Sequence, residues 1–378
     1  MANATRVTEG SKGTGIAVAE RAAEHSLWLS SLPSIRRAPI GDLFPQLLAG
    51  AELEPLTEPI AAPVVTIART LAVGHGPVSD MTVSPDGRYL VTAHYGADVV
   101  CVIDAATLTV TATIDGLSEP YAAVVVGDRA YVSAASNELD AVVAVDTRTG
   151  MPLAAKTFEM TAGGLAVSPA ADKLYVARTA DDTVDIAVVD VETGEVASIE
   201  IPAAPGSSVE SLSVSANGAR LFAALTTPVG GMLAIVDAAD RSVLNVVPVA
   251  GSIGDIAVMP NGRTVFATGW DAEFGGAVHV IDVAGARVTD TIGMGGVPTQ
   301  LVLGRGGNCA FIVDRNEIAV LCTATTEIVD SVIIGPQLSC VAADPVRNRL
   351  YAADYAGVIT ALRLETAAQQ PQLAVAAS

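Results

Sequence analysis

A pattern of strand-like segments recurs from residue 64 almost to the end of the chain, and it limits the possible folds more than any other feature. The copy from Ser79 to Ile114 contains four apolar or alternating segments, which we expect to be four strands. A Ser-Pro-Asp-Gly turn separates the first two segments, and the third segment ends at Asp104. Third segments such as VVCVID are apolar at nearly every position, so both faces of each sheet must be covered by neighbouring copies.

The turn between the first and second strands occurs seven times. Its copies are SPDGRYL (84–90), VVGDRAYV (125–132), SPAADKLYV (168–176), SANGARLFA (215–223), MPNGRTVFA (259–267), LGRGGNCAFI (303–312) and DPVRNRLYA (344–352). The third strand ends at Asp104, Asp146, Asp190, Asp237, Asp282 and Cys322, at spacings of 42, 44, 47, 45 and 40 residues. A period in the forties with four strands is typical of propeller blades. The sequence predicts an all-β fold, a seven-bladed β-propeller of four-stranded antiparallel blades.

The two ends of the repeat region predict how the ring closes. The last copy, Leu338–Leu364, supplies only three strands. The segment Thr66–Gly74 near the start has the pattern of the fourth strand at Thr109–Gly116. Pairing this segment beside Val358–Leu364 would complete the last blade and leave no open sheet edge between the two ends. We therefore expect an N-terminal strand to complete the seventh blade.

The sequence divides into three parts: an arm (1–63), the propeller (64–365) and a C-terminal tail (366–378). Within the arm, Ile16–Leu29 has the spacing of a short amphipathic helix, and prolines interrupt the sequence that follows. We favour an arm that straps over the propeller, because apolar stripes usually pack on their own fold. A docking element for a partner or an envelope surface is the alternative.

Composition and charge narrow the classes of function. The 21 basic and 41 acidic residues give a net charge of -20, which repels phosphates and disfavours a role in nucleic-acid binding. No apolar stretch approaches the roughly 18 residues of a membrane span, and no Sec-type signal is visible. We expect a soluble, cytoplasmic monomer. Arg36-Arg37 leaves non-Sec export to the envelope open.

The cysteines lack the close spacing of known metal and redox motifs. Cys101, Cys309, Cys322 and Cys340 form no Cys-x-x-Cys pair of the kind found in zinc, redox or haem sites. Three of them stand at positions that are apolar or small in the other copies. We expect buried, reduced thiols rather than disulfides or metal ligands.

Strand order predicts two different rims. The turns after the first and third strands are short and repetitive and share one rim. The connections after the second and fourth strands vary and share the other rim, where binding usually occurs. The candidate ligand-binding residues are Asp80 at the channel and, on the variable rim, Tyr95, Tyr121, Arg178, Trp270, Asp271, Glu273, Arg315 and Tyr355. Trp270 either anchors its loop or contacts a partner.

One position in each first strand is expected to face the central channel. The seven copies of this position are Asp80, Ala122, Gly164, Ser211, Asp255, Gln300 and Cys340. Asp80 and Asp255 are candidate ligands for a divalent cation, and Ser211 and Gln300 could add oxygen atoms. We favour the alternative of polar residues that line a wet channel, because two carboxylates without close spacing are a weak metal signal. No other cofactor is indicated.

Two histidines are candidate general bases. His75 and His94 are predicted on the variable rim, where Asp80 or Asp354 could orient an imidazole. His279 stands at a third-strand position that is small or apolar in most copies, so a packed core imidazole is expected there.

The repeat resembles the bacterial YVTN-type β-propeller repeat family, whose consensus combines SPDG, LYV, VxVID and TxxVxxTIxVG. SPDG stands at Ser84–Gly87, LYV at Leu174–Val176 and the GxxP lead-in at Gly295–Pro298. The resemblance covers Val64–Glu365 and implies a propeller fold. Similar propellers serve as binding surfaces, surface-layer modules, lactonase-like enzymes and electron-transfer domains. The family consensus implies no catalytic residues for this chain.

Two hypotheses for function follow. The leading one is a non-catalytic binding or scaffold module that engages a protein partner or a small polar ligand through its variable rim, because no set of nucleophile, base and orienting residue is identified. The alternative is a lactonase-like hydrolase that uses rim carboxylates with His75 or His94 and a divalent cation. Only the enzyme requires histidine, arginine and carboxylates to converge within hydrogen-bond reach.

Overall fold

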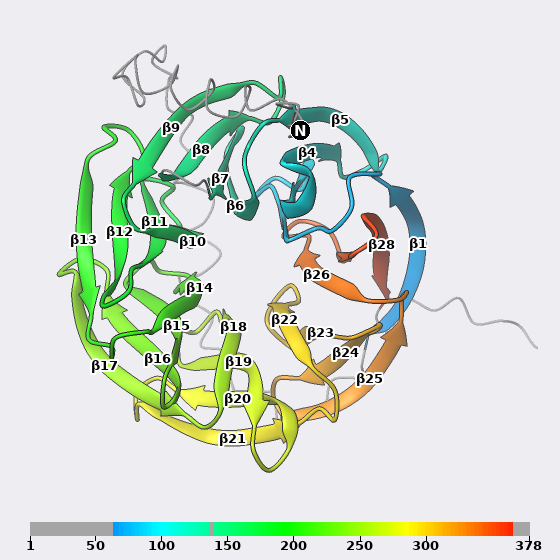
Figure 1. The fold of residues 1–378 in the computed structure, drawn as a ribbon. Coiled ribbons are helices and arrows are strands. Elements are labelled where there is room, and N and C mark those ends of the chain that lie inside the picture. The colour runs from blue at the N-terminus through cyan, green and yellow to red at the C-terminus, as the bar shows by residue number, and fades with distance from the viewer. Residues whose placement is uncertain (1–62, 136–138, 366–378) are drawn as a thin grey trace, which may run out of the picture.

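The computed structural model describes residues 63–135 and 139–365, which form seven four-stranded antiparallel sheets arranged in a ring (Figure 1). The arm before residue 63, with its expected helix at 16–29, and the C-terminal tail lie outside the described residues. Among the described residues, no helix has the length and hydropathy of a membrane span. The prediction of a seven-bladed β-propeller with four-stranded blades is confirmed.

Each blade consists of four strands, named a to d from the centre outward. Blade one is β2 (Asp80–Val83), β3 (Tyr89–His94), β4 (Val99–Asp104) and β5 (Thr109–Asp115); blade two is β6 (Pro120–Val126), β7 (Arg129–Ala134), β8 (Asp140–Asp146) and β9 (Pro152–Phe158); blade three is β10 (Thr161–Val167), β11 (Lys173–Thr179), β12 (Val184–Asp190) and β13 (Val196–Ile201); blade four is β14 (Ser208–Val214), β15 (Arg220–Thr227), β16 (Gly230–Asp237) and β17 (Ser242–Val249); blade five is β18 (Ser252–Val258), β19 (Thr264–Asp271), β20 (Gly275–Asp282) and β21 (Arg287–Gly293); blade six is β22 (Pro298–Leu303), β23 (Cys309–Asp314), β24 (Glu317–Cys322) and β25 (Glu327–Ile333); blade seven is β26 (Leu338–Ala343), β27 (Arg349–Asp354), β28 (Val358–Glu365) and β1 (Val64–Ala72). One 3-10 turn, η2 (Tyr95–Ala97), lies between β3 and β4.

Strand β1 closes the ring, as the sequence predicted. It is the outermost strand of blade seven and pairs antiparallel with β28, from Val64 opposite Glu365 to Ala72 opposite Val358. In Figure 1 the blue β1 and the red β28 therefore lie side by side although they come from opposite ends of the repeat region. Blade seven is also tied to blade one, because the Tyr351 hydroxyl donates a hydrogen bond of 2.9 Å to the carbonyl of Ala105.

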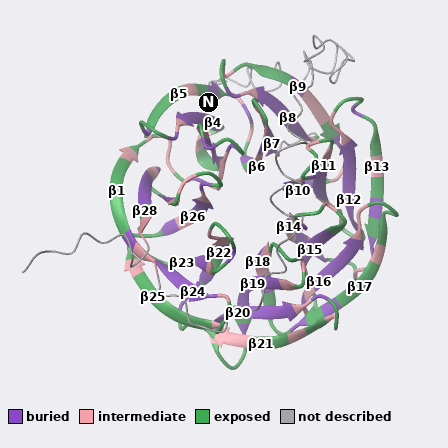
Figure 2. Ribbon diagram, turned by 180° about the vertical axis from the view of Figure 1, so that it is seen from behind, coloured by how far each residue is buried: buried purple, intermediate pink, exposed green. Residues whose placement is uncertain are grey.

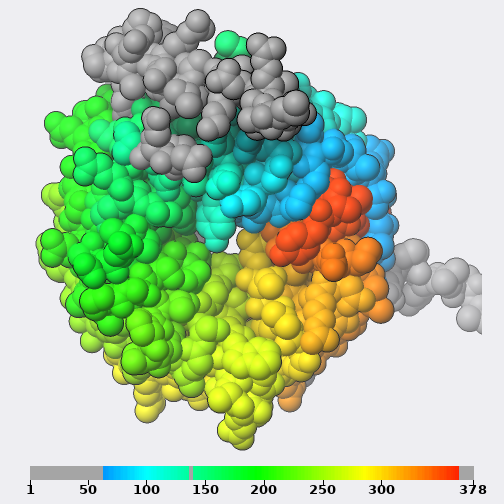
Figure 3. All heavy atoms as spheres, in the orientation of Figure 1, coloured from blue at the N-terminus to red at the C-terminus, as the bar shows by residue number. Residues whose placement is uncertain are grey.

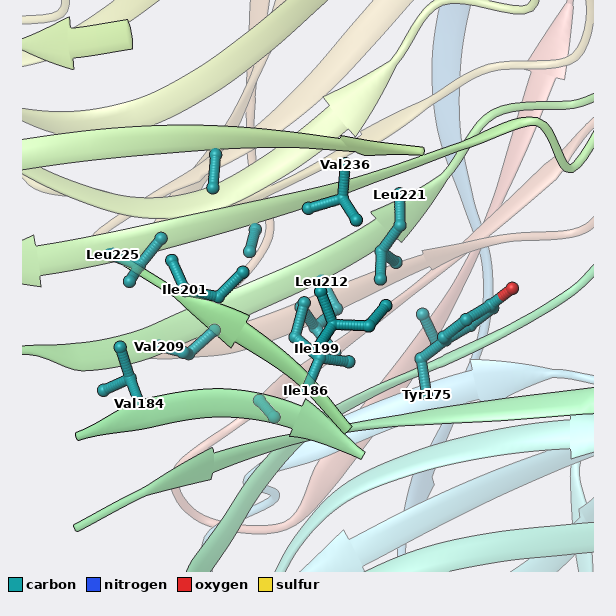
Figure 4. Close-up of a cluster of buried hydrophobic side chains, with 14 of the residues drawn as sticks. Tyr175, Val184, Ile186, Ile199, Ile201, Val209, Leu212, Leu221, Leu225 and Val236 are labelled. Atoms are coloured by element: carbon teal, nitrogen blue, oxygen red, sulfur yellow. The ribbon is translucent and has the colours of Figure 1, made fainter. Parts of the chain in front are cut away.

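The core is divided among the interfaces between blades. The described residues form seven apolar clusters, each made by two consecutive blades. Between blades three and four, for example, Ile186 and Ile199 pack with Leu212 and Leu221 (Figure 4). Figure 2 shows the consequence: middle strands such as β12 and β16 are largely buried, whereas the outer β13 and β17 are largely exposed. The continuous apolar runs of the third strands are thus covered on both faces.

The short turns after the first and third strands are fixed by recurring side-chain contacts. In blade one, the Ser84 hydroxyl accepts the N–H of Tyr89 at 2.9 Å, and Gly87 adopts the positive φ of 69° that favours glycine. After the third strand, Asp104 Oδ1 accepts the N–H of Thr107 at 2.7 Å. The same kind of bond is made by Asp146, Asp190, Asp237 and Asp282. The recurring aspartates therefore fix turns.

Candidate functional site

The a strands of the blades surround a central cavity of about 340 Å³. Figure 3 shows its opening at the middle of the ring. Its polar lining includes Asp80, Tyr121, Glu210, Ser211, Asp255 and Gln300. Six of the seven positions expected at the channel line this cavity, whereas Cys340 is fully buried in the core.

Irregularities in the a strands bring additional residues to the cavity. The pairing of β14 with β15 shifts register just before Ser211, and the pairing of β22 with β23 shifts just before Gln300. Such a shift lets two consecutive residues share one face, which regular alternation forbids. Glu210 and Thr299 therefore line the cavity beside the expected residues. Regular alternation predicts one channel position in each blade, so neither residue was expected at the cavity.

The carboxylate of Asp80 joins blade one to blade two. Its Oδ2 accepts the N–H of Ala123 in β6 at 2.8 Å, and its Oδ1 accepts the N–H of Met81 at 2.8 Å. Gln300 Nε2 lies 3.5 Å from the same Oδ1. Burial raises the pKa of Asp80 above its ordinary value, while these hydrogen bonds oppose the rise. Asp80 therefore satisfies a backbone donor of the neighbouring blade.

Asp255 has the equivalent role between blades five and six. Its Oδ2 accepts the N–H of Leu301 in β22 at 3.0 Å, and its Oδ1 accepts the Ser211 hydroxyl at 2.8 Å. Burial raises the pKa of Asp255 to about 6, and the charge of Asp80 adds to this rise. The carboxylate oxygens of both aspartates thus already accept protein hydrogen bonds. Within residues 63–135 and 139–365, no three His, Cys, Asp or Glu side chains gather in a group that could hold a metal ion.

We expect Asp255→Asn to be more thermally stable than the parent near pH 7.5, and the difference to shrink toward pH 4.5. A carboxyl group with a raised folded-state pKa stabilises the fold fully below its ordinary pKa of 3.8, and this contribution is lost as pH rises to about 6. The amide is neutral at every pH and can still pair with Leu301 and Ser211. The expected gain is about 1–3 kcal/mol at neutral pH.

Thermal denaturation across this pH range checks the prediction. Ser211→Ala is the matched control, because it removes one hydrogen bond from Asp255 and leaves the carboxyl group to titrate. Because the lost hydrogen bond lowers the pKa of Asp255 in the parent, the control should keep a pH dependence at least as strong as that of the parent, and Asp255→Asn should weaken it. Parallel curves for the parent and Asp255→Asn would contradict the assignment.

The two candidate histidines lie together, but His94 is buried rather than exposed. Its Nδ1–H donates to the carbonyl of Gly76 at 3.3 Å, and its Nε2 lies 2.9 Å from the Thr92 hydroxyl. Burial lowers the pKa of His94, and the neighbouring His75 lowers it further. The half-buried His75 packs edge-on against it, with ring centroids 5.8 Å apart. Asp354 accepts N–H groups of its own loop and does not orient the His94 ring.

Exposed aromatic side chains gather on the face that carries the b–c and d–a connections, which we call the loop face. Every exposed aromatic residue among those described lies in these connections or at their edges: Tyr95, Tyr121, Trp270, Phe274 and Tyr355, each 46–53% exposed. The rings of the blade-five loop rest on glycine backbone. Trp270 lies against Gly275, and Phe274 packs so closely on Gly293 that a Cβ there would come within 3.2 Å of its ring.

The structure divides the other rim candidates into exposed and internal residues. Glu273 and Arg315 are exposed. Arg178 instead forms an internal ion pair with Asp185, and its guanidinium stacks over the Phe158 ring at 5.4 Å. Asp271 is also buried, and its Oδ1 accepts the N–H of Glu273 at 2.8 Å. Asp271 therefore shapes the loop that presents its neighbours.

Charge is distributed unequally between the two faces. The exposed carboxylates of the loop face are Asp98, Asp115, Glu119, Glu159, Asp181, Asp182 and Glu273, and Arg315 is the exposed cation in its described connections. The opposite face also carries exposed carboxylates, such as Asp86, Asp128 and Asp240, but exposed arginines near its turns balance them: Arg88, Arg148, Arg220, Arg241, Arg263, Arg287 and Arg305. At the cavity, burial and the charges of Glu210, Asp80 and Asp255 raise the pKa of Tyr121. The loop face and the cavity thus form one region of negative potential.

These features define a seven-bladed β-propeller with an acidic, aromatic loop face around a polar cavity. The chain is 28% identical over 326 residues to the seven-bladed beta-propeller protein Rv1057 of Mycobacterium tuberculosis, and the match covers 77% of this chain and 82% of that protein. No family model matches the chain. The YVTN-type relationship therefore rests on the motif resemblance alone.

Two solved structures share the fold. The first is Kuenenia stuttgartiensis hydrazine synthase, with a TM-score of 0.68, 21% identity and coverage of 80% of this chain and 98% of that chain. The second is the Cps50 (Swd1) β-propeller domain of Myceliophteria thermophila, with a TM-score of 0.66, 15% identity and coverage of 79% and 99%. At these identities the likeness concerns the fold only.

Proposed function

We propose that this chain is a binding protein whose loop face holds a cationic segment of a partner protein. The observation that carries the proposal is the presence of exposed aromatic rings and exposed carboxylates on the same face. Aromatic faces attract lysine and arginine side chains, and carboxylates add charge complementarity. Arg315 is the exposed cation of the described connections, so little on this face would repel such a segment.

The aromatic residues of blade five are suited to act as anchors. Trp270 is 52% exposed and Phe274 46% exposed, while the inner side of each ring is backed by glycine backbone. Aromatic side chains held in place lose little conformational entropy on binding and often dominate interface energies. Glu273 lies between them in sequence and adds an exposed carboxylate. This loop is therefore the proposed centre of the interface.

The central cavity provides a place for one basic side chain of the partner. Glu210, Asp80 and Asp255 contribute carboxylates to its wall, and Tyr121 lies at the same wall with its hydroxyl under their influence. A volume of about 340 Å³ accommodates a lysine or arginine side chain. A small polar ligand with amino groups would use the same carboxylates, which makes it the alternative occupant.

The hydrolase hypothesis has less support from the geometry. The His94 ring is fully buried, and both of its nitrogens are engaged by Thr92 and Gly76. A general base must reach the proton that it abstracts. Asp80 and Asp354, which were expected to orient His75 or His94, accept backbone N–H groups instead. We therefore propose binding rather than lactone hydrolysis.

A titration with model peptides tests the proposed function. An oligolysine peptide should quench or shift the fluorescence of Trp270 and should bind less tightly as salt rises, whereas oligoglutamate should not bind. The Trp270→Ala variant should bind oligolysine about tenfold or more weakly, as measured by isothermal titration calorimetry. The control is Asp240→Ala, which removes an exposed carboxylate from the opposite face and should leave the affinity unchanged.

Three outcomes decide between the occupants. Equal binding of oligolysine and oligoglutamate, or an unchanged affinity in Trp270→Ala, would contradict the loop face as a site for cationic segments. Binding of a free triamine as tightly as the peptide would favour the small polar ligand in the cavity.

A further inference from the structure

Blade six differs from blades two to four at one cross-strand position. In blades two to four, a basic residue at the start of the b strand lies opposite the aspartate that ends the c strand: Arg129–Asp146, Lys173–Asp190 and Arg220–Asp237. The side chains at this position can touch, since Lys173 Nζ lies 2.5 Å from Asp190 Oδ2. In blade six the two residues are Cys309 and Cys322, directly opposite each other in β23 and β24.

The backbone geometry of this pair suits a disulfide. The N–H of Thr323 donates to the carbonyl of Asn308 at 3.1 Å, so Asn308 and Thr323 form a hydrogen-bonded pair. The adjacent Cys309–Cys322 pair is therefore of the non-hydrogen-bonded kind, in which Cα atoms are about 4.5 Å apart and both side chains lie on one face. A disulfide requires a Cα separation of about 4.4–6.8 Å. The strands need not move for the two sulfurs to join.

Cys322 occupies the place of a turn-fixing aspartate. Burial alone would raise the pKa of its thiol, but hydrogen bonds from the Thr325 hydroxyl and from the N–H groups of Thr325 and Ala324 lower the pKa below its ordinary value. In the other blades the same kind of turn binds a carboxylate, so this turn is built to hold an anion. The thiolate is the reactive form of cysteine.

Cys309 has the properties of the second thiol. It is half-buried, in contrast to the prediction that all cysteines are buried. Burial raises its pKa, and the negative charge of Cys322 raises it further. Cys101 and Cys340 have no exposed surface, and burial raises the pKa of both thiols. Cys309 thus differs from these two cysteines in exposure, and Cys322, which is also buried, differs from them in the lowered pKa of its thiol.

We propose that Cys309 and Cys322 are a redox-active dithiol that hydrogen peroxide converts to a cross-strand disulfide. The Cys322 thiolate attacks one peroxide oxygen, the O–O bond breaks, and the departing hydroxide takes up a proton to become water. The Cys309 sulfur then attacks the resulting sulfenic acid, and a second water leaves with the Cys309 proton. Two thiols and one peroxide give one disulfide and two waters. The pair lies at the face opposite the loop face, so this proposal is independent of the proposed function.

Thiol titration and non-reducing peptide mapping test the proposal on the reduced full-length chain. After hydrogen peroxide treatment, two of the four thiols should be lost, and one linked peptide pair should join Cys309 to Cys322. Cys101→Ala, which alters a buried thiol, is the matched control and should form the same link. Cys309→Ala should instead leave a sulfenic acid on Cys322 that dimedone traps.

Cys322→Asp removes one thiol without disturbing the fold, because aspartate is the residue found at this position in five other blades. Loss of the disulfide in this variant can then not be attributed to misfolding. This variant should fold, as its circular dichroism spectrum reports, and should form no intramolecular disulfide. Retention of all four thiols in the oxidised parent would overturn the proposal. Linkage through Cys101 or Cys340, or links between chains in place of the internal one, would also overturn it.

Discussion

Deletion of residues 64–72 is expected to abolish the cooperative unfolding transition of the propeller or to lower its midpoint by more than about 10 °C. This deletion removes β1, which pairs with β28 through eight residue pairs. It also removes Val65 and Leu71 from the two apolar clusters that flank blade seven. The newly open edge of β28 should promote association between chains. Differential scanning calorimetry and light scattering report both effects.

A rearranged chain provides the control for this deletion. Val64 lies opposite Glu365, so β1 can follow β28 through a short linker in a chain that starts at residue 75 and ends with residues 63–74. Every blade of this permutant would consist of four consecutive strands. Its melting midpoint should return to within a few degrees of the parent. A deletion variant that melts like the parent would show that β1 does not stabilise the ring.

Replacement of Asp80 by alanine is expected to lower the free energy of unfolding by about 2–4 kcal/mol, because it leaves two backbone N–H groups at the cavity wall without their acceptor. The N–H groups of Met81 and Ala123 both donate to this carboxylate. For a domain of this size, the loss corresponds to a fall in melting midpoint of roughly 3–6 °C.

Two further variants identify the cause of the loss. Asp80→Asn keeps one acceptor oxygen and should cost less than the alanine change. Asp240→Ala removes an exposed carboxylate and should have little effect. An Asp80→Ala variant as stable as the parent would mean that the link between blades one and two is dispensable. If added calcium stabilised the parent but not Asp80→Ala, the channel aspartates would be metal ligands after all.

The fold was predictable because the hydrophobic pattern of the repeat shows which strands must be buried. Each third strand is apolar on both faces, and the regular spacing of residues such as Asp104 and Asp146 marks the turn that follows. The match between Thr66–Gly74 and the fourth strands identified the closing strand in the same way. These features depend on local sequence and on the need to cover sheet faces, which a single chain reveals.

The site was less predictable because it depends on pairing between strands. The register shift before Ser211 exposes Glu210 to the cavity, and no local pattern indicates such a shift. The burial of His94 arises from its contacts with Gly76 and His75, which lie in the connection between β1 and blade one. The opposition of Cys309 and Cys322 likewise required the register of β23 and β24.

The antiparallel pairing of β1 and β28 has a mechanical consequence. The peptide chain enters the propeller at Val64 and leaves it at Glu365, and these residues are partners at one end of the same ladder. Tension applied between the two termini would load this ladder one rung at a time, as a zipper is opened, rather than shear all rungs together. Stretching in an optical trap should therefore detach β1 first and at low force, before the other strands of the ring unfold.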